Sequence, residues 1–256
     1  MDRFVAWFCR IAFVFLYIPI VAVVVYSFNA SEVSYRYTGV TTHWYAELFH
    51  DDRLLETLRT SAVVGVLASL VATAIGFLTA FALARYRVKG RAFFLGAIMI
   101  PLIVPEIVLG VSLLEIFSRA GIPNGLLTLV LGHVVITLPL ATLVQMGAMT
   151  SLDPSLSEAA TDLGANGWVI FRRVLFPLLR PSVLAAFLLS FTTSFSNIVI
   201  STFTSGVGTT TLPLRIYSSL RTGLTPELNA LGTLLVLFTL AVIVLVGVRQ
   251  MRRILA

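Results

Sequence analysis

Cysteine and histidine are scarce in this chain, and each shortage excludes a class of site. Cys9 is the only cysteine among 256 residues, so the chain can form no internal disulfide and no cysteine zinc site. The three histidines, His43, His50 and His133, are too dispersed for an H-E-x-x-H motif. We therefore expect no metal centre.

Lysine is scarcer still, and this excludes a nucleotide-binding loop. A Walker A motif needs Gly-Lys followed by Ser or Thr, whereas the single lysine, Lys89, is followed by Gly90. No Gly-x-Ser-x-Gly elbow occurs, and His133 is the only histidine in an apolar segment. We expect the chain not to be an enzyme and to hold no cofactor of its own.

Charged residues are also few: 12% of the chain, against about 25% in soluble domains. Hydrophobic residues make up 58%, and the mean hydropathy is +0.97. A membrane-spanning helix needs roughly 20 apolar residues. The sequence predicts an all-α membrane protein, one domain over 1–256, with spans at about 8–28, 58–84, 92–117, 125–148, 182–204 and 229–248.

The basic residues predict the orientation of these six spans. With the N-terminus inside, twelve of the 18 Lys and Arg residues fall on the cytoplasmic side, and the positive-inside rule favours this arrangement. Both termini are then cytoplasmic. The net charge of +6 reflects this topology and the lipid headgroups, and nucleic-acid binding is not expected.

Two carboxylates lie within the third predicted span. A charge at mid-membrane costs roughly 3 kcal/mol on insertion scales. Glu106 follows Pro101 and Pro105, which should bend the helix. It either faces a translocation path for a cationic solute, or bonds in its protonated form to a freed carbonyl, or lies near the interface. Glu115 is expected to be solvated or paired with Arg119.

Three further polar residues lie in the fourth and fifth spans. His133 and Gln145 are expected chiefly as hydrogen-bond partners between helices. Asn197 either lines the path or packs between helices. Glu106, Asn197 and Gln145 are the candidate path residues. Small residues four apart, such as Gly76 and Ala80, either allow close helix packing or recur by chance.

The charged segment 153–181 lies between the fourth and fifth spans. Asp153-Pro154 is typical of a helix start, and Ser155 with Glu158 has capping-box spacing. An apolar face follows at helical spacing, formed by Leu156, Ala159, Ala160 and Leu163. Gly164 should end this helix. A second short helix is expected to carry Trp168, Phe171, Leu175, Arg172 and Arg173, and to be closed by Pro177 and Pro181.

The same segment resembles the EAA loop of ABC-importer permeases. That pattern is Glu-Ala-Ala, three residues, Gly, nine residues, then Ile-x-Leu-Pro. Its positions are filled here by Glu158, Ala159, Ala160, Gly164, Val174, Phe176 and Pro177. The stretches PEIVLGVSLL and TTLPLRIYSSLRTGLTPELNAL are similar to permeases of the spermidine/putrescine type. The resemblance covers nearly the whole chain.

This resemblance implies a type I ABC-importer permease fold, with the first span against a partner. It implies a heterodimer with a second permease, two ATPase subunits that bind ATP and magnesium, and a periplasmic solute-binding protein in the bacterial inner membrane. The ATPase would dock on the two short helices of segment 153–181 that are joined at Gly164, which we call the knob. The implied coupling residues are Ser155, Glu158, Ala159, Ala160, Asp162, Leu163, Gly164, Trp168 and Arg172. Glu158 could equally only cap its own helix.

The implied function is ATP-driven import of a small organic solute such as spermidine or putrescine. Polyamine permeases often carry acidic residues near Ser196 and Asn197, and this chain has none there. An opine, a phosphonate or an amino-acid-like solute is therefore an alternative, as is a gradient-driven transporter. Arg215, Tyr217 and Arg221, on a short external helix, are candidates for the outer gate or for contact with the binding protein.

Overall fold

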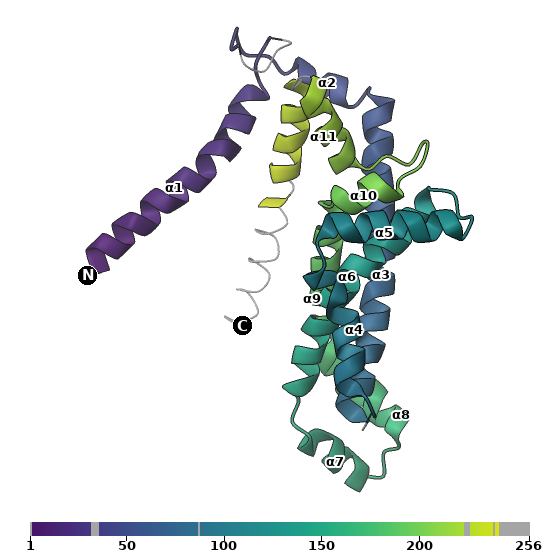
Figure 1. Ribbon diagram of the computed structural model, residues 1–256. Coiled ribbons are helices and arrows are strands. Elements are labelled where there is room, and N and C mark those ends of the chain that lie inside the picture. The colour runs from purple at the N-terminus through teal and green to yellow at the C-terminus, as the bar shows by residue number, and fades with distance from the viewer. Residues whose placement is uncertain (1, 32–35, 87, 223–225, 238, 241–256) are drawn as a thin grey trace. The chain divides into compact units, whose positions relative to one another are not determined.

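The structure is a computed structural model that describes residues 2–31, 36–86, 88–222, 226–237 and 239–240. Within these ranges every regular element is a helix, apart from one isolated bridge between Asn29 and Val40. The chain forms two compact units: Met1–Leu55 with Ile216–Ala256, and Glu56–Arg215. The predicted all-α class is confirmed (Figure 1).

The first unit contains α1 (Asp2–Tyr26) and α2 (His43–Leu48). Of α1, the stretch Val5–Tyr26 is long and apolar enough to cross a membrane, and none of it is buried within the chain. The loop after α1 is organised by Asn29, whose side chain donates to the Arg36 carbonyl and accepts from the Thr38 N–H.

The last predicted span belongs to the same unit. Its described part, Pro226–Leu237, is an apolar helix. The remainder of 229–248 falls mostly outside the described residues.

The second unit is built on three long helices, α3 (Asp52–Arg85), α6 (Leu126–Thr150) and α9 (Phe176–Phe195). Ala72, Ala141 and Ala186 form a buried cluster of small side chains. A Cβ on Gly76 would lie 2.9 Å from the Thr142 nitrogen and 3.1 Å from the Ala141 carbonyl carbon. The close approach predicted from Gly76 and Ala80 is therefore present, because α3 and α6 nearly touch there.

The third predicted span is broken. It consists of α4 (Arg91–Ile103) and α5 (Glu106–Arg119), which are bent by 107° at the break. Val104 and Pro105 are extended, with ψ of 133° and 131°. The residue before a proline avoids the helical region, and proline lacks the N–H that would continue the ladder. The bend expected from the prolines of the predicted span 92–117 is present, but it is a full break between two helices rather than a kink within one.

The fifth predicted span also differs from the expectation. α8 (Gly167–Ile170), a π turn (Phe171–Leu175) and α9 form one run, Gly167–Phe195. The expected closure at Pro177 and Pro181 is therefore wrong. Pro177 enters at the first turn of α9, just after the wider π turn, where its missing N–H is tolerated. The run ends at Phe195, and α10 (Val199–Thr204) follows a short break.

Candidate functional site

The charged segment 153–181 begins with α7 (Ser155–Asp162), which lies with α8 at one end of the second unit (Figure 1). The Asp153 carboxylate accepts a hydrogen bond of 2.9 Å from the Ser155 N–H. Hydrogen bonds from the Ser155 backbone and side chain hold the pKa of Asp153 below its usual value. The expected Ser155–Glu158 capping box is absent, because Asp153 satisfies the first amide and Ser155 already lies inside the helix.

Gly164 ends α7 as predicted. Its φ is +81°, a left-handed conformation that only glycine adopts readily. The Gly164 N–H donates to the Thr161 carbonyl at 2.8 Å, and the Ala165 N–H donates to the Ala160 carbonyl at 3.0 Å. These two bonds define a Schellman motif, which satisfies carbonyls at the end of the helix. The turn therefore depends on the absence of a side chain at Gly164.

The apolar face of α7 is open to its surroundings. Leu163 is 88% exposed and Leu156 is 40% exposed, while Ala159 between them is also exposed. Ala160 packs on the buried cluster formed by Ala80, Met149, Ile170, Leu175 and Leu179. Glu158, Asp162 and Arg172 are exposed as well. Because α7 is anchored on one side and apolar on its open side, it is suited to contact another protein.

Aromatic rings connect this segment to α3. Trp168 stacks on Phe171, with ring centroids 5.7 Å apart. Phe171 in turn meets Phe81 edge-on at 5.3 Å and Phe77 at 6.1 Å. The π turn places Phe171 in this cluster, so Phe171 joins the segment to the aromatic side chains of α3.

Glu106 and Asn197 meet where two predicted spans are broken. Glu106 is the first residue of α5, directly after the 107° bend, and Asn197 lies between α9 and α10. The Asn197 amide donates to the Glu106 carboxylate. Its own oxygen accepts from the Ile200 N–H at 2.8 Å, which caps α10. Glu106 remains exposed, so one carboxylate is held at the junction with an accessible oxygen.

A buried network continues from this junction. The Ser201 hydroxyl donates to the Asn197 carbonyl, and it lies 3.1 Å from His133 Nε2. His133 Nδ1 lies 2.7 Å from the Ser194 hydroxyl. His133 is 1% exposed, so it joins α6 to α9 and α10, as expected of a hydrogen-bond partner between helices.

The other candidate residues lie apart from this junction. Gln145 is fully buried and donates to the Thr73 and Ala141 carbonyls, so it joins α6 to α3 away from Glu106. Glu115 pairs with Arg119 at 2.6 Å, as expected. On α11 (Leu212–Thr222), Arg215 is half-buried and Tyr217 is exposed, whereas the side chain of Arg221 lies outside the described residues.

Several contacts within these regions were not predicted from the sequence. Asn166 caps α8 by accepting from the Val169 N–H at 3.0 Å, and its spacing before that helix could have indicated this role. Ser194 and Ser201 contact His133 across 61 and 68 residues, which no local pattern reveals. Among the described residues, no three His, Cys, Asp or Glu side chains lie close enough together to hold a metal ion.

Comparison with known proteins finds relatives that are all membrane components of transport systems. Residues 72–254 match the family described as "Binding-protein-dependent transport system inner membrane component". The chain is 41% identical to the spermidine/putrescine transport system permease protein PotC of Haemophilus influenzae, covering 96% of each. It is 37% identical to the putrescine transport system permease protein PotI of Escherichia coli, covering 88% of this chain and 83% of that protein.

Solved structures support the fold. A bacterial ABC transporter for import of the polysaccharide alginate matches with a TM-score of 0.67 and 18% identity, covering 97% of this chain and 95% of that one. The MetNI methionine ABC transporter matches with a TM-score of 0.62 and 20% identity, covering 84% and 99%. The predicted type I ABC-importer permease fold is thereby confirmed. The chain belongs to the family of binding-protein-dependent transport system inner membrane components.

Proposed function

We propose that this chain is the permease subunit of an ATP-driven importer of polyamines such as spermidine or putrescine. The observation that carries the proposal is the exposed α7 knob, with Leu163 88% exposed at the Gly164 turn. Relatives at 41% and 37% identity bear the names of spermidine/putrescine and putrescine permeases. Their solutes are organic cations, which a carboxylate such as Glu106 can bind.

The energy for transport comes from a separate ATPase subunit that binds α7. The single lysine, Lys89, is followed by Gly90, so this chain has no Walker A loop. Glu158 and Asp162 present negative charge on the knob, and Leu156 and Leu163 present apolar surface. A cleft on the ATPase subunit with a basic rim and an apolar floor would complement both the negative charge and the apolar surface of the knob. The aromatic contact of Phe171 with Phe77 and Phe81 carries the motion into the bundle.

The complete importer contains a second permease, two ATPase subunits and a periplasmic binding protein. It lies in a bacterial inner membrane with both termini of this chain in the cytoplasm, because that orientation places most Arg residues inside. α1 is apolar and unburied within the chain, which suits a helix that packs on lipid or on the second permease. Arg215 and Tyr217 contribute to the outer gate or to contact with the binding protein.

The translocation path passes Glu106 and Asn197. Two broken spans meet there, and non-helical backbone at membrane depth is tolerated where it lines a cavity or is buried in protein. The Glu106 carboxylate accepts from Asn197 and keeps an exposed edge for the ammonium of a passing solute. A single carboxylate on this chain favours transient contact over tight binding, since conduction needs a site that releases its solute.

The test uses the whole complex reconstituted in vesicles with its binding protein, and compares two neutralising variants. Glu106→Gln should reduce spermidine uptake by about 10- to 150-fold, because a charge-assisted hydrogen bond contributes about 1.5–3 kcal/mol. Glu115→Gln is the control on the same helix, with an exposed carboxylate that pairs with Arg119. Unchanged uptake in Glu106→Gln would contradict the path assignment.

Two further readouts separate the rival functions. If the solute is an opine, a phosphonate or an amino-acid-like compound, the isolated binding protein will bind that class and not polyamines. If transport is gradient-driven, a protonophore will abolish uptake while ATP is present, and Glu158 variants will have no effect. We expect uptake that requires ATP and resists the protonophore.

A further inference from the structure

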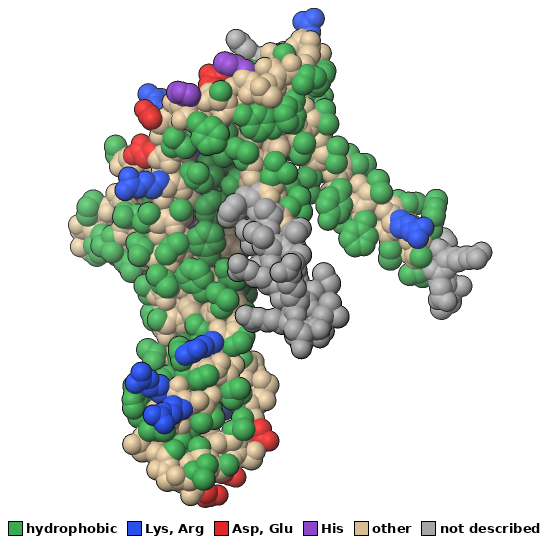
Figure 2. Space-filling view, turned by 180° about the vertical axis from the view of Figure 1, so that it is seen from behind, with side chains coloured by type: hydrophobic (Ala, Val, Ile, Leu, Met, Phe, Trp, Pro, Cys, Tyr) green, Lys and Arg blue, Asp and Glu red, His purple; other side chains and the backbone are tan. Residues whose placement is uncertain are grey.

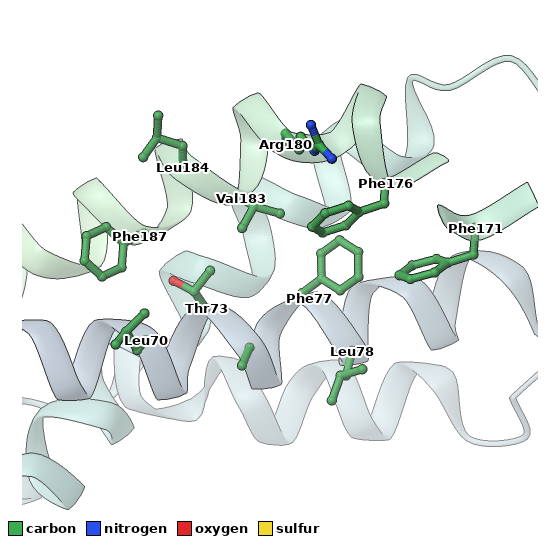
Figure 3. A pocket seen from close by; sticks show the side chains of 11 residues that line it. Leu70, Thr73, Phe77, Leu78, Phe171, Phe176, Arg180, Val183, Leu184 and Phe187 are labelled. Carbon is green, nitrogen blue, oxygen red and sulfur yellow. The ribbon is translucent and has the colours of Figure 1, made fainter. Parts of the chain in front are cut away.

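An apolar groove runs along the outer face of α3 and α9. It encloses about 620 Å³. Figure 3 shows aromatic and aliphatic side chains from both helices turned toward it, with Arg180 between Val183 and Phe176. Its walls are formed by Leu70, Thr73, Ala74, Phe77, Leu78, Phe171, Phe176, Arg180, Val183, Leu184 and Phe187.

The two ends of the groove differ in charge. At one end, Leu70 and Phe187 are purely apolar. Toward the other end, which is lined by Phe176 and Phe171, the Arg180 guanidinium lies over the Phe176 ring, 5.5 Å from its centroid. Arg180 is exposed, and no carboxylate pairs with it in the described part of the chain. An arginine within a membrane-spanning helix is costly unless it reaches the headgroups or an anion.

The length of the groove corresponds to one leaflet. From Phe176 to Phe187, α9 rises about 16 Å at roughly 1.5 Å per residue, and the hydrocarbon core of a bilayer is roughly 30 Å thick. Trp168 and Tyr86 line the adjoining hollow, together with Arg85. Trp and Tyr are enriched at the headgroup level of membrane proteins. The Arg180 end therefore lies toward the headgroups, and the Leu70 end lies toward mid-membrane.

We propose that this groove binds an anionic phospholipid, with one acyl chain between α3 and α9 and the phosphate on Arg180. Arg85 lines the adjoining hollow, and a second basic side chain there favours a lipid with net negative charge over a zwitterionic one. Figure 2 shows Lys and Arg side chains gathered near this end of the second unit. Lipid here would fill the space beside Phe77 and Phe171, next to the coupling contacts.

A transmembrane helix of another subunit is the alternative occupant. An apolar helix stripe would match the walls of the groove, but it would leave Arg180 without an anion. A phospholipid supplies both the chain and the phosphate. Charge complementarity at Arg180 therefore favours lipid.

The test is native mass spectrometry of the intact importer complex, delipidated and then titrated with phosphatidylglycerol or phosphatidylcholine. Wild type should retain phosphatidylglycerol over phosphatidylcholine. Arg180→Gln should weaken phosphatidylglycerol binding about tenfold. Arg173→Gln is the matched control, since Arg173 is exposed on the same helical run but lines neither the groove nor the adjoining hollow.

A second variant addresses the acyl chain. Ala74→Phe places a large side chain in the groove without changing its charge, and it should weaken the binding of both lipids. Equal phosphatidylglycerol retention by wild type, Arg180→Gln and Ala74→Phe would overturn the proposal. So would cross-linking of the Leu184→Cys variant, in a Cys9→Ser background, to another subunit of the complex, because a helix would then occupy the groove.

Discussion

Replacement of Gly164 by alanine tests the turn that ends α7. The Gly164 φ of +81° is unfavourable for alanine by about 1–2 kcal/mol. Nothing lies within 4 Å of an added Cβ, so no steric clash contributes and the whole effect is conformational. This energy shifts the equilibrium between the native turn and its alternatives by about 5- to 30-fold. Fewer molecules would then present α7 in the geometry needed for docking.

Two assays follow this change. Amide hydrogen exchange should show faster exchange at Ala165, whose N–H is bonded to the Ala160 carbonyl in the native turn. Solute-stimulated ATP hydrolysis by the reconstituted complex should fall in parallel. Gly164→Asn should be milder than Gly164→Ala, because asparagine tolerates left-handed backbone better.

The control is Gly167→Ala. Gly167 begins α8, has no positive φ, and likewise has open space around a Cβ. It should keep native exchange at Ala165 and native ATP hydrolysis. If Gly164→Ala and Gly167→Ala behave alike in both assays, the turn does not determine coupling and the reasoning is refuted.

Three further outcomes are expected. Gly76→Ala should destabilise the complex by about 1–3 kcal/mol, because the added Cβ would press on the α6 backbone. Gly96→Ala should not, because nothing lies near a Cβ there, and thermal unfolding of the two variants distinguishes them. His133→Leu should lower the unfolding temperature, because the buried Ser194 hydroxyl would lose its partner at a cost of about 1–3 kcal/mol, while Ser201 would keep its bond to the Asn197 carbonyl. An unchanged temperature would count against the network. The depressed pKa of Asp153 means that its cap is fully present above its ordinary value of 3.8 and is lost as pH falls below it. Protection of the Ser155 amide, measured relative to its intrinsic exchange rate, should therefore decrease only there, and Asp153→Ala should remove this pH dependence.

Local chemistry made several features predictable. Gly164 ends α7 because its position after an apolar helical pattern requires a left-handed residue. Glu115 pairs with Arg119 because residues four apart share a helix face. The apolar runs of α3 and α6 predicted spans close to those observed, since length and hydropathy suffice for a continuous helix.

The differences arise where distant segments decide the conformation. Pro105 alone predicts a kink, whereas at the 107° break α10 packs on α5 and Asn197, just before α10, donates to Glu106. The π turn before Pro177 keeps the helix continuous, and the packing of Phe171 on Phe77 and Phe81 stabilises it. Neither contact can be inferred from a window of neighbouring residues.

Cross-linking from the knob is the most direct measurement of the central claim. In a Cys9→Ser background, Leu163→Cys places one thiol on a side chain that is 88% exposed on α7. In cells that express the whole importer, we expect this thiol to cross-link to the ATPase subunit and to resist a membrane-impermeant reagent added from outside. Labelling from outside, or the absence of any cross-link to the ATPase subunit, would contradict the account.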